Sequence, residues 1–274
     1  MLFVFALNLL SAIFEFAGGL LTGSVAILSD AMHDLGDAAS VGVAYYLEKK
    51  SRRAPDDRHT YGYLRYSVLG AAVTDTVLIA GSVTVIFFAL SRLFDPEPIH
   101  GGGMVFFAIF GLGANLTAAY LTRGGESLNQ KAVHLHMAED VLGWTAVLVG
   151  AAVYCLTGFA AVDALLSIGV ALFIMWGAVQ SFRRILPLFL DKTPEGLSVE
   201  SVKKAVEAVE GVEEVHHLHL RSFDGTVSCA TLHIVTCRSD LYELKSEVRQ
   251  VLAALGIAHA TLETEAKDEP CGEP

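Results

Sequence analysis

Long apolar runs dominate the first two thirds of this sequence and limit most strongly how it can fold. A hydrocarbon core about 30 Å thick needs about 20 apolar residues in an α-helix. Six runs come close to that length. Their approximate cores are Leu2–Leu21, Ser24–Tyr46, Tyr66–Leu90, Met104–Leu121, Ala132–Thr157 and Val162–Phe182. Only 18% of the residues are charged, against about 25% in soluble domains. The sequence therefore predicts an α-helical membrane protein with a six-helix transmembrane bundle.

The composition changes near Pro187–Glu195, and the remainder has the pattern of a soluble domain. Capping residues, apolar spacing and an Asp-Gly turn indicate two helices and three strands there. The expected elements are a helix after Ser198, strands on either side of Asp224-Gly225, a helix over Leu241–Leu255 and a strand over Ala258–Glu265. We therefore expect a transmembrane domain over residues 1–190 and a cytoplasmic domain over residues 191–274, a small α+β domain with the order α-β-β-α-β.

Positive charge is distributed unevenly among the predicted loops, and Lys and Arg accumulate on the cytoplasmic side of membrane proteins. One side of the bundle carries Lys49, Lys50, Arg52, Arg53, Arg58, Arg65, Arg123, Lys131, Arg183, Arg184 and Lys192. The other side carries Arg92 alone. This bias predicts a multi-pass protein, in the cell (inner) membrane, with both termini in the cytoplasm.

Charge and cysteine content exclude several functions. The net charge of −11 argues against nucleic acid, whose phosphates need a basic surface. The four cysteines form no CxxC pair, so neither a disulfide framework nor a zinc ribbon is indicated. Cys271 lies in a polar segment, where it could be a free thiol or a ligand. No phosphate-binding GxxxxGK[ST] motif is present to supply energy from ATP.

Two predicted membrane helices repeat the pattern His-x-x-x-Asp, as His33 with Asp37 and as His136 with Asp140. Positions four apart share one face of a helix. Two such helices side by side offer two nitrogen and two oxygen ligands, a set that suits zinc. A carboxylate in the bilayer costs about 2.5–3.5 kcal/mol on insertion scales, and a bound dication offsets that cost. His134 and Glu139 lie off or beside the shared face.

The sequence resembles the cation diffusion facilitator family in three places. Gly23–Asp37 resembles its second-helix motif, Asp57–Arg65 its loop between helices two and three, and His136–Asp140 its fifth-helix motif. The resemblance implies six helices followed by a metallochaperone-like cytoplasmic domain, metal efflux in exchange for protons, and a homodimer. It also implies that His33, Asp37, His136 and Asp140 are the transport ligands. Members with two His-Asp pairs typically carry Zn²⁺ and often tolerate Cd²⁺ or Co²⁺.

The resemblance further implies a cytoplasmic metal site at His216, His233, Glu263 and Glu265, with Zn²⁺ as a regulatory ligand. Glu263 and Glu265 are two apart, so both would lie on one face of a strand. An ordinary acidic sheet surface that carries histidines is the alternative. Asp57 and His59, together with Asp56, resemble a weaker loop site of some members.

Two functions other than transport are compatible with metal ligands in a membrane protein. A membrane metalloenzyme needs an open coordination position and a general base, but His136–Asp140 has no second His at the fourth position. We therefore expect no enzyme. A membrane metal sensor that does not transport needs no buried carboxylates in its anchor, so transport is the favoured reading. A transporter that prefers Cd²⁺ or Co²⁺ stays open, because these ions accept the same ligands.

Overall fold

The computed structural model describes the chain in two units, Met1–Ile185 and Leu186–Pro274. It describes all residues except 1, 23–24, 95–100, 158–160, 268, 270 and 272–274. The side chains of residues 15, 18–22, 25–34, 92, 94, 101–108, 110, 147, 151, 154–155 and 162–163 are also not described. The two units are treated separately below.

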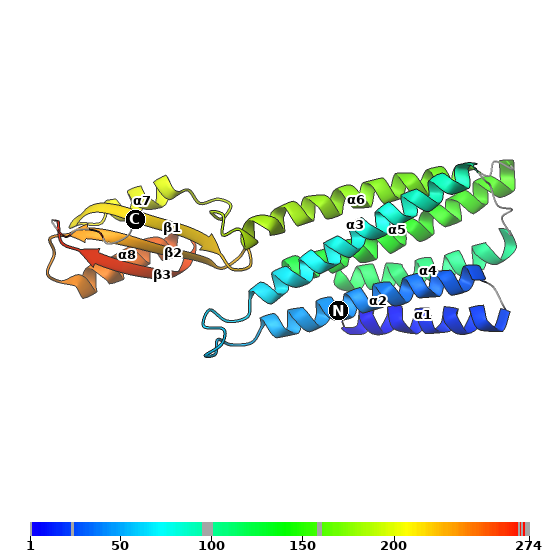
Figure 1. Cartoon of the computed structure of the whole chain (residues 1–274), viewed down its shortest axis with the longest axis horizontal. Helices are drawn as coiled ribbons and strands as arrows, with labels where there is room; N and C mark the ends of the chain where they lie inside the picture. The colour runs from blue at the N-terminus through cyan, green and yellow to red at the C-terminus, as the bar shows by residue number, and fades with distance from the viewer. Residues whose placement is uncertain are drawn as a thin grey trace. The chain divides into compact units, whose positions relative to one another are not determined.

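Long helices make up the described part of the first unit (Figure 1). They are α1 (Leu2–Thr22), α2 (Val25–Ser51), α3 (Arg65–Phe94), α4 (Gly101–Thr122), α5 (Leu128–Thr157) and α6 (Ala161–Phe189). Each predicted apolar run falls within one of them, except Ser24, which lies outside the described residues. Among the described residues, Arg65–Ser91 and Ala164–Phe189 are long and apolar enough to cross a membrane by length and composition. The count of six spans stays a prediction.

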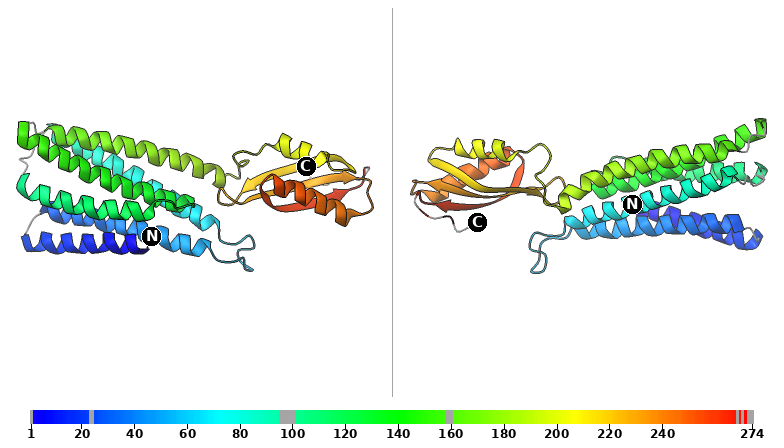
Figure 2. Two further views of the ribbon diagram at one scale, coloured as in Figure 1. Left: turned by 180° about the vertical axis from the view of Figure 1, so that it is seen from behind. Right: turned by 45° about the horizontal axis from the view of Figure 1, so that its top comes forward.

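Glycines let neighbouring helices of the first unit approach closely. α1 packs against α2, α4 packs against α5, and α3 contacts both α2 and α5, as the views in Figure 2 agree. A Cβ atom at Gly42 on α2 would lie 2.9 Å from the Phe5 ring on α1, and one at Gly111 on α4 would lie 2.4 Å from the Trp144 ring on α5. Small residues at such contacts are typical of membrane helices, which associate through close packing. The core shared by α1, α2, α4 and α5 contains Val4, Val41, Ala44, Ala118, Val133 and Met137.

A buried carboxylate joins α2, α3 and α5 near their charged ends. Glu48 on α2 is 6% exposed and accepts hydrogen bonds from the Ser67 hydroxyl on α3 (2.9 Å) and the Ser127 hydroxyl (3.0 Å). The Asn129 amide on α5 donates to the Ala44 carbonyl (2.7 Å) and to Glu48 (3.3 Å). Hydrogen bonds to charged groups are worth about 1.5–3 kcal/mol, so this network fixes the spacing of three helices.

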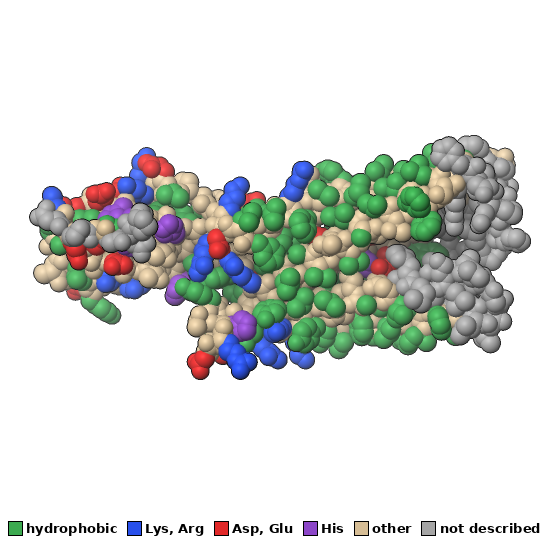
Figure 3. All heavy atoms as spheres, in the orientation of Figure 1, with side chains coloured by type: hydrophobic (Ala, Val, Ile, Leu, Met, Phe, Trp, Pro, Cys, Tyr) green, Lys and Arg blue, Asp and Glu red, His purple; other side chains and the backbone are tan. Residues whose placement is uncertain are grey.

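Large apolar side chains cover much of the visible outer surface of this unit (Figure 3). Exposed examples are Phe87 and Phe88 on α3 and Phe173 and Trp176 on α6. An apolar surface of this extent is unusual on a soluble monomer and marks contact with membrane or protein. Lys and Arg lie instead around the loop between α2 and α3, where Arg52, Arg53 and Arg58 are exposed.

The second unit has the predicted order α-β-β-α-β. Its elements are α7 (Val199–Glu207), β1 (Val212–Ser222), β2 (Ser228–Thr236), α8 (Leu241–Ala254) and β3 (Ile257–Glu265). The Ser198 hydroxyl accepts from the Ser201 N–H and the Ser201 hydroxyl accepts from the Ser198 N–H, a capping box that starts α7. In the sheet, β2 lies between β1, which is antiparallel to it, and β3, which is parallel to it. The two helices close one core with the sheet, which includes Val202, Val206, Leu232, Ile234, Leu244, Val248 and Leu252.

Candidate metal-binding sites

The first candidate site lies inside the helical unit, where α2 meets α5. Ligand atoms of Asp37 on α2 and of His136 and Asp140 on α5 all lie within 4.8 Å of one another. Asp37 is 8% exposed and His136 is 2% exposed. The His136 Nε2 atom lies 3.7 Å from the Asp37 Oδ1 atom. The structure therefore brings three of the four predicted intramembrane residues together.

His136 is buried without the hydrogen bonds that a structural histidine makes. Neither of its ring nitrogens has a hydrogen-bond partner among the described residues. The second carboxylate beside the ring is that of Glu139, whose Oε2 atom lies 3.9 Å from His136 Nδ1 and also lacks such a partner. Buried polar groups are nearly always bonded. A buried imidazole whose nitrogens make no hydrogen bond and lie 3.7 Å and 3.9 Å from carboxylate oxygens fits a site for a dication.

The fourth predicted residue, His33, is on α2, but its side chain lies outside the described residues. His33 precedes Asp37 by four positions within one continuous helix, so the two share a helix face.

Two other polar residues of the helical unit lie apart from this cluster. The Nδ1 atom of His134 lies 3.1 Å from the Thr122 hydroxyl on α4. Asp75 on α3 is fully buried, and its carboxylate oxygens have no hydrogen bond of standard geometry among the described residues, although the Ser181 hydroxyl on α6 interacts with it. The contact between His134 and Thr122 connects α5 with α4, as expected for a residue beside the shared face.

The loop between α2 and α3 places Asp56, and not Asp57, beside His59. The His59 Nδ1 atom lies 3.7 Å from Asp56 Oδ1, and Asp56 accepts hydrogen bonds from the Tyr63 hydroxyl (2.6 Å) and the backbone N–H of His59 (2.8 Å). The Tyr63 hydroxyl is the first cause that lowers the pKa of Asp56. Asp56 is thus occupied by protein donors. The proposed site at Asp57 and His59 stays a prediction.

The second candidate site lies on the sheet of the second unit. Ligand atoms of His216 (β1), His233 (β2), Glu265 (β3) and Cys271 lie within 4.8 Å of one another. The Glu265 carboxylate lies 3.0 Å from His216 Nε2 through one oxygen and 2.6 Å from His233 Nδ1 through the other. His216 pairs with His233 in the strand register. Three strands therefore each contribute one ligand-type side chain, and the segment after β3 contributes the fourth.

Glu263 and His217 border this cluster without joining it. The Glu263 Oε2 atom lies 3.5 Å from His233 Nε2, and the Glu263 side chain is 67% exposed, whereas that of Glu265 is 8% exposed. A register shift between His216 and His219 gives His217 a positive φ of 46° and sets its ring 5.2 Å from the His233 ring. The sequence leaves the role of Cys271 open and indicates no function for His217, because a bulge leaves no signal in simple alternation.

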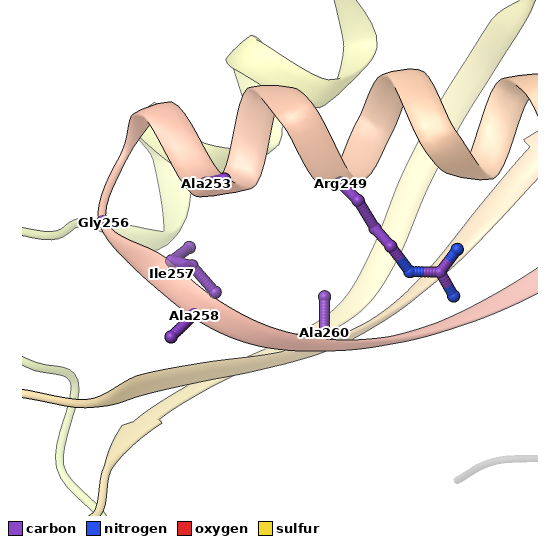
Figure 4. A pocket seen from close by; sticks show the side chains of 6 residues that line it. All are labelled: Arg249, Ala253, Gly256, Ile257, Ala258 and Ala260. Atoms are coloured by element: carbon purple, nitrogen blue, oxygen red, sulfur yellow. The ribbon is translucent and has the colours of Figure 1, made fainter.

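A shallow pocket between α8 and β3 lacks any of these ligand residues. Its described lining consists of Arg249, Ala253, Gly256, Ile257, Ala258 and Ala260 (Figure 4). Arg249 extends from α8 beside Ala260 in that view. One guanidinium above a row of small side chains offers no metal ligand. The pocket is therefore unrelated to either cluster.

A membrane-type helical unit followed by an α+β unit, each with metal-ligand residues clustered inside it, defines the class of integral membrane proteins that handle metal cations. Residues 1–190 match the family described as the cation efflux transmembrane domain, and residues 194–263 match the one described as the cation efflux protein cytoplasmic domain. The chain therefore belongs to the cation efflux, or cation diffusion facilitator, family, as its motifs predicted. Members of this family are transporters of zinc and other divalent cations and not enzymes.

Individual relatives cover nearly the whole chain. A zinc transporter ZitB of Pectobacterium atrosepticum is 34% identical over 92% of this chain and 80% of its own length. The zinc transporter ZitB of Escherichia coli is 31% identical over 100% of this chain and 88% of its own length. A Bacillus subtilis protein described as a cadmium, cobalt and zinc/H⁺-K⁺ antiporter is 29% identical over 93% of this chain and 85% of its own length.

Proposed function

We propose that this protein exports Zn²⁺ from the cytoplasm across the inner membrane in exchange for protons, with His33, Asp37, His136 and Asp140 as its transport ligands. The observation that carries the proposal is that ligand atoms of Asp37, His136 and Asp140 lie within 4.8 Å of one another. The His136 imidazole is buried, and its nitrogens make no hydrogen bond among the described residues. Two imidazoles and two carboxylates suit zinc in tetrahedral geometry. The names of the ZitB relatives support the same cation.

Exchange with protons follows from the chemistry of the ligands. A histidine binds metal only in its neutral form, and an imidazole ordinarily titrates near physiological pH. Protonation of His33 or His136 on the outer side weakens the site and releases the metal. Loss of that proton to the cytoplasm restores the site for the next ion. The antiporter among the relatives supports this scheme, because its name includes H⁺.

The proposed architecture places six spanning helices in residues 1–190 and a cytoplasmic domain in residues 191–274. The excess of Lys and Arg near the loop between α2 and α3 supports termini on the cytoplasmic side. We propose a homodimer, as the family resemblance implies. Cd²⁺ and Co²⁺ accept the same ligands, so we propose both as secondary substrates.

The cytoplasmic cluster is proposed as a regulatory zinc site, with His216, His233 and Glu265 as ligands. Glu263 faces the ring nitrogen of His233 that points away from Glu265. A carboxylate on the second nitrogen fixes the orientation of a metal-binding histidine. Glu263 is therefore assigned to the orientation of His233 and not to the metal.

The test is zinc flux into proteoliposomes that contain an internal zinc dye, with and without an opposing pH gradient. Asp37→Ala and Asp140→Ala are compared with Glu126→Ala, which removes an exposed carboxylate of the loop between α4 and α5. We expect gradient-dependent flux in the native protein and in Glu126→Ala, and none in the other two. Unaltered flux in Asp37→Ala and Asp140→Ala would remove the site assignment, and flux that ignores the gradient would remove proton exchange.

A further inference from the structure

We propose that Cys271 is the fourth ligand of the cytoplasmic site, so that this site binds its metal through two imidazoles, one carboxylate and one thiolate. The inference rests on the regulatory site proposed above and names a ligand that neither the sequence motifs nor the family match includes, since the matched cytoplasmic domain ends at residue 263. Such a donor set is softer than one of nitrogen and oxygen alone and favours thiophilic dications, Cd²⁺ and Zn²⁺, over Mn²⁺.

The position of the thiol carries the proposal. The Cys271 Sγ atom lies 3.7 Å from His233 Nδ1, and all four ligand atoms lie within 4.8 Å of one another. In a tetrahedral zinc site, bond lengths of about 2.0–2.3 Å set sulfur and nitrogen about 3.6 Å apart, and nitrogen and oxygen about 3.3 Å apart. The distances from Sγ to His233 and from Glu265 to His216 (3.0 Å) are close to these values.

One buried nitrogen of the cluster has no hydrogen bond, whereas His233 Nδ1 and a Glu265 oxygen form one with each other (2.6 Å). The Nε2 atom of His216 is buried and lies 3.0 Å from a Glu265 oxygen, yet it forms no hydrogen bond of acceptable geometry within the described part of the chain. The Glu265 oxygen at 2.6 Å from His233 Nδ1 must move outward when a metal binds between them. Glu263 lies near Nε2 of His233, whereas Nδ1 of the same ring faces Glu265 and Cys271.

Described residues between β3 and Cys271 make contacts within the segment and with β1. The Glu269 carboxylate accepts from the Ala266 N–H (3.0 Å), and the Ala266 carbonyl accepts from the Glu269 N–H (3.0 Å), which forms a turn. Lys267 pairs with Glu213 at the start of β1 (3.0 Å). The segment is therefore held by hydrogen bonds between Ala266 and Glu269 and by the ion pair of Lys267 with β1. Coordination of a metal by Cys271 releases the thiol proton to solvent and adds a third anchor.

The experiment uses full-length protein in detergent micelles with Asp37→Ala and Asp140→Ala, so that bound metal reports the cytoplasmic site. Co²⁺ is titrated, and the thiolate-to-cobalt charge-transfer absorption is recorded together with the cobalt d–d bands. Cys271→Ser is compared with Cys237→Ser, whose hydroxyl keeps the donor to Glu213 that the Cys237 thiol provides (2.7 Å). Competition with Cd²⁺ and Zn²⁺ then gives the relative affinities. Circular dichroism verifies the fold of each variant.

We expect a charge-transfer band in the parent protein and in Cys237→Ser, and no such band in Cys271→Ser. We also expect Cys271→Ser to lose about tenfold or more in Cd²⁺ affinity and less in Zn²⁺ affinity. A band that persists in Cys271→Ser overturns the proposal. Co²⁺ binding that lacks the band but disappears in His233→Ala overturns Cys271 as a ligand and keeps the regulatory site. Absence of Co²⁺ binding overturns both the Cys271 ligand and the regulatory site. Zinc flux through the native protein tests transport independently of that result.

Discussion

The His136 Nε2 atom on α5 lies 3.7 Å from the Asp37 Oδ1 atom on α2 across the contact between the two helices. Each helix therefore contributes to the same site, and a relative movement of α2 and α5 changes the distance between ligands. Tetrahedral binding to zinc requires ligand atoms about 3.3 Å apart, so a small separation of the helices weakens the site. Metal affinity and the arrangement of these two helices are thereby coupled.

Replacement of His136 by Asp is expected to change which metal is transported. The substitution exchanges a nitrogen ligand for a hard oxygen ligand, which favours Mn²⁺ relative to Zn²⁺. We expect zinc flux to fall by about tenfold or more and the ratio of manganese to zinc flux to rise. His134→Asp is the matched control on the same helix, since His134 contacts Thr122 and not the cluster. An equal change in both variants would contradict the assignment of His136.

Glu139→Gln is expected to weaken zinc binding without abolishing it. Glu139 lies 3.9 Å from the His136 nitrogen that faces away from Asp37, where a carboxylate orients the ring of a metal-binding histidine. Loss of such a partner typically costs about 10–100-fold in metal affinity. Competition with a zinc chelator measures the affinity, and Glu139→Asp is expected to recover part of it. Unchanged affinity in Glu139→Gln would exclude this role.

The intramembrane residues were predictable because their relation is local. Four positions along one helix bring His136 and Asp140 to the same face whatever surrounds them, and the apolar runs set the helices themselves. The contact between α2 and α5 depends on tertiary packing. The sequence indicates this contact only through two similar motifs, which we expect to face each other. The cost of unpaired carboxylates in a bilayer justified that expectation.

The cytoplasmic cluster was predictable only in part because its geometry is not local. The pairing of His216 with His233 depends on the strand register, and the bulge at His217 shifts that register within β1. Two-residue spacing places Glu263 and Glu265 on one face, but their burial differs greatly, because Glu265 lies between His216 and His233 whereas Glu263 is largely exposed. The segment that leads to Cys271 contains the turn at Ala266 and Glu269, which alternation does not reveal.

Gly70→Ala is expected to destabilise the helical unit. A Cβ atom at Gly70 on α3 would lie 2.7 Å from Asn129 Oδ1, and Asn129 is held by its hydrogen bonds to Ala44 and Glu48. Overpacking of this kind costs about 1–3 kcal/mol. Gly81→Ala on the same helix is the control, because an added Cβ there meets no described atom within 4 Å. Thermal unfolding in detergent should show a lower Tm for Gly70→Ala only. Equal Tm values in the two variants would mean that the Asn129 side chain moves aside without cost.

Tyr63→Phe is expected to raise the pKa of Asp56 toward its ordinary value. The Tyr63 hydroxyl, followed by the His59 backbone N–H, holds that pKa below 3.8. Because the folded-state pKa is depressed, ionised Asp56 stabilises the loop above pH 3.8, and this contribution is lost as the pH falls through the folded-state pKa. The variant should lose part of that pH dependence. NMR titration of the labelled Asp56 carboxyl carbon measures the shift, and Tyr61→Phe is the control, since the donors that lower the Asp56 pKa are Tyr63, His59 and Arg58.

Glu265 and Glu263 are expected to differ in their effects on the cytoplasmic site, although both lie next to His233. Glu265 lies between two imidazoles, at 3.0 Å from His216 and 2.6 Å from His233. Its replacement by Gln removes an anionic ligand and should abolish Co²⁺ binding in protein that lacks the transport ligands. Glu263 contacts only the far nitrogen of His233 among the described residues, so Glu263→Gln should reduce affinity by about tenfold and leave the shape of the cobalt spectrum unchanged. Equal losses with altered spectra in both variants would instead make Glu263 a ligand, and the metal would then bind His233 through Nε2, away from Cys271.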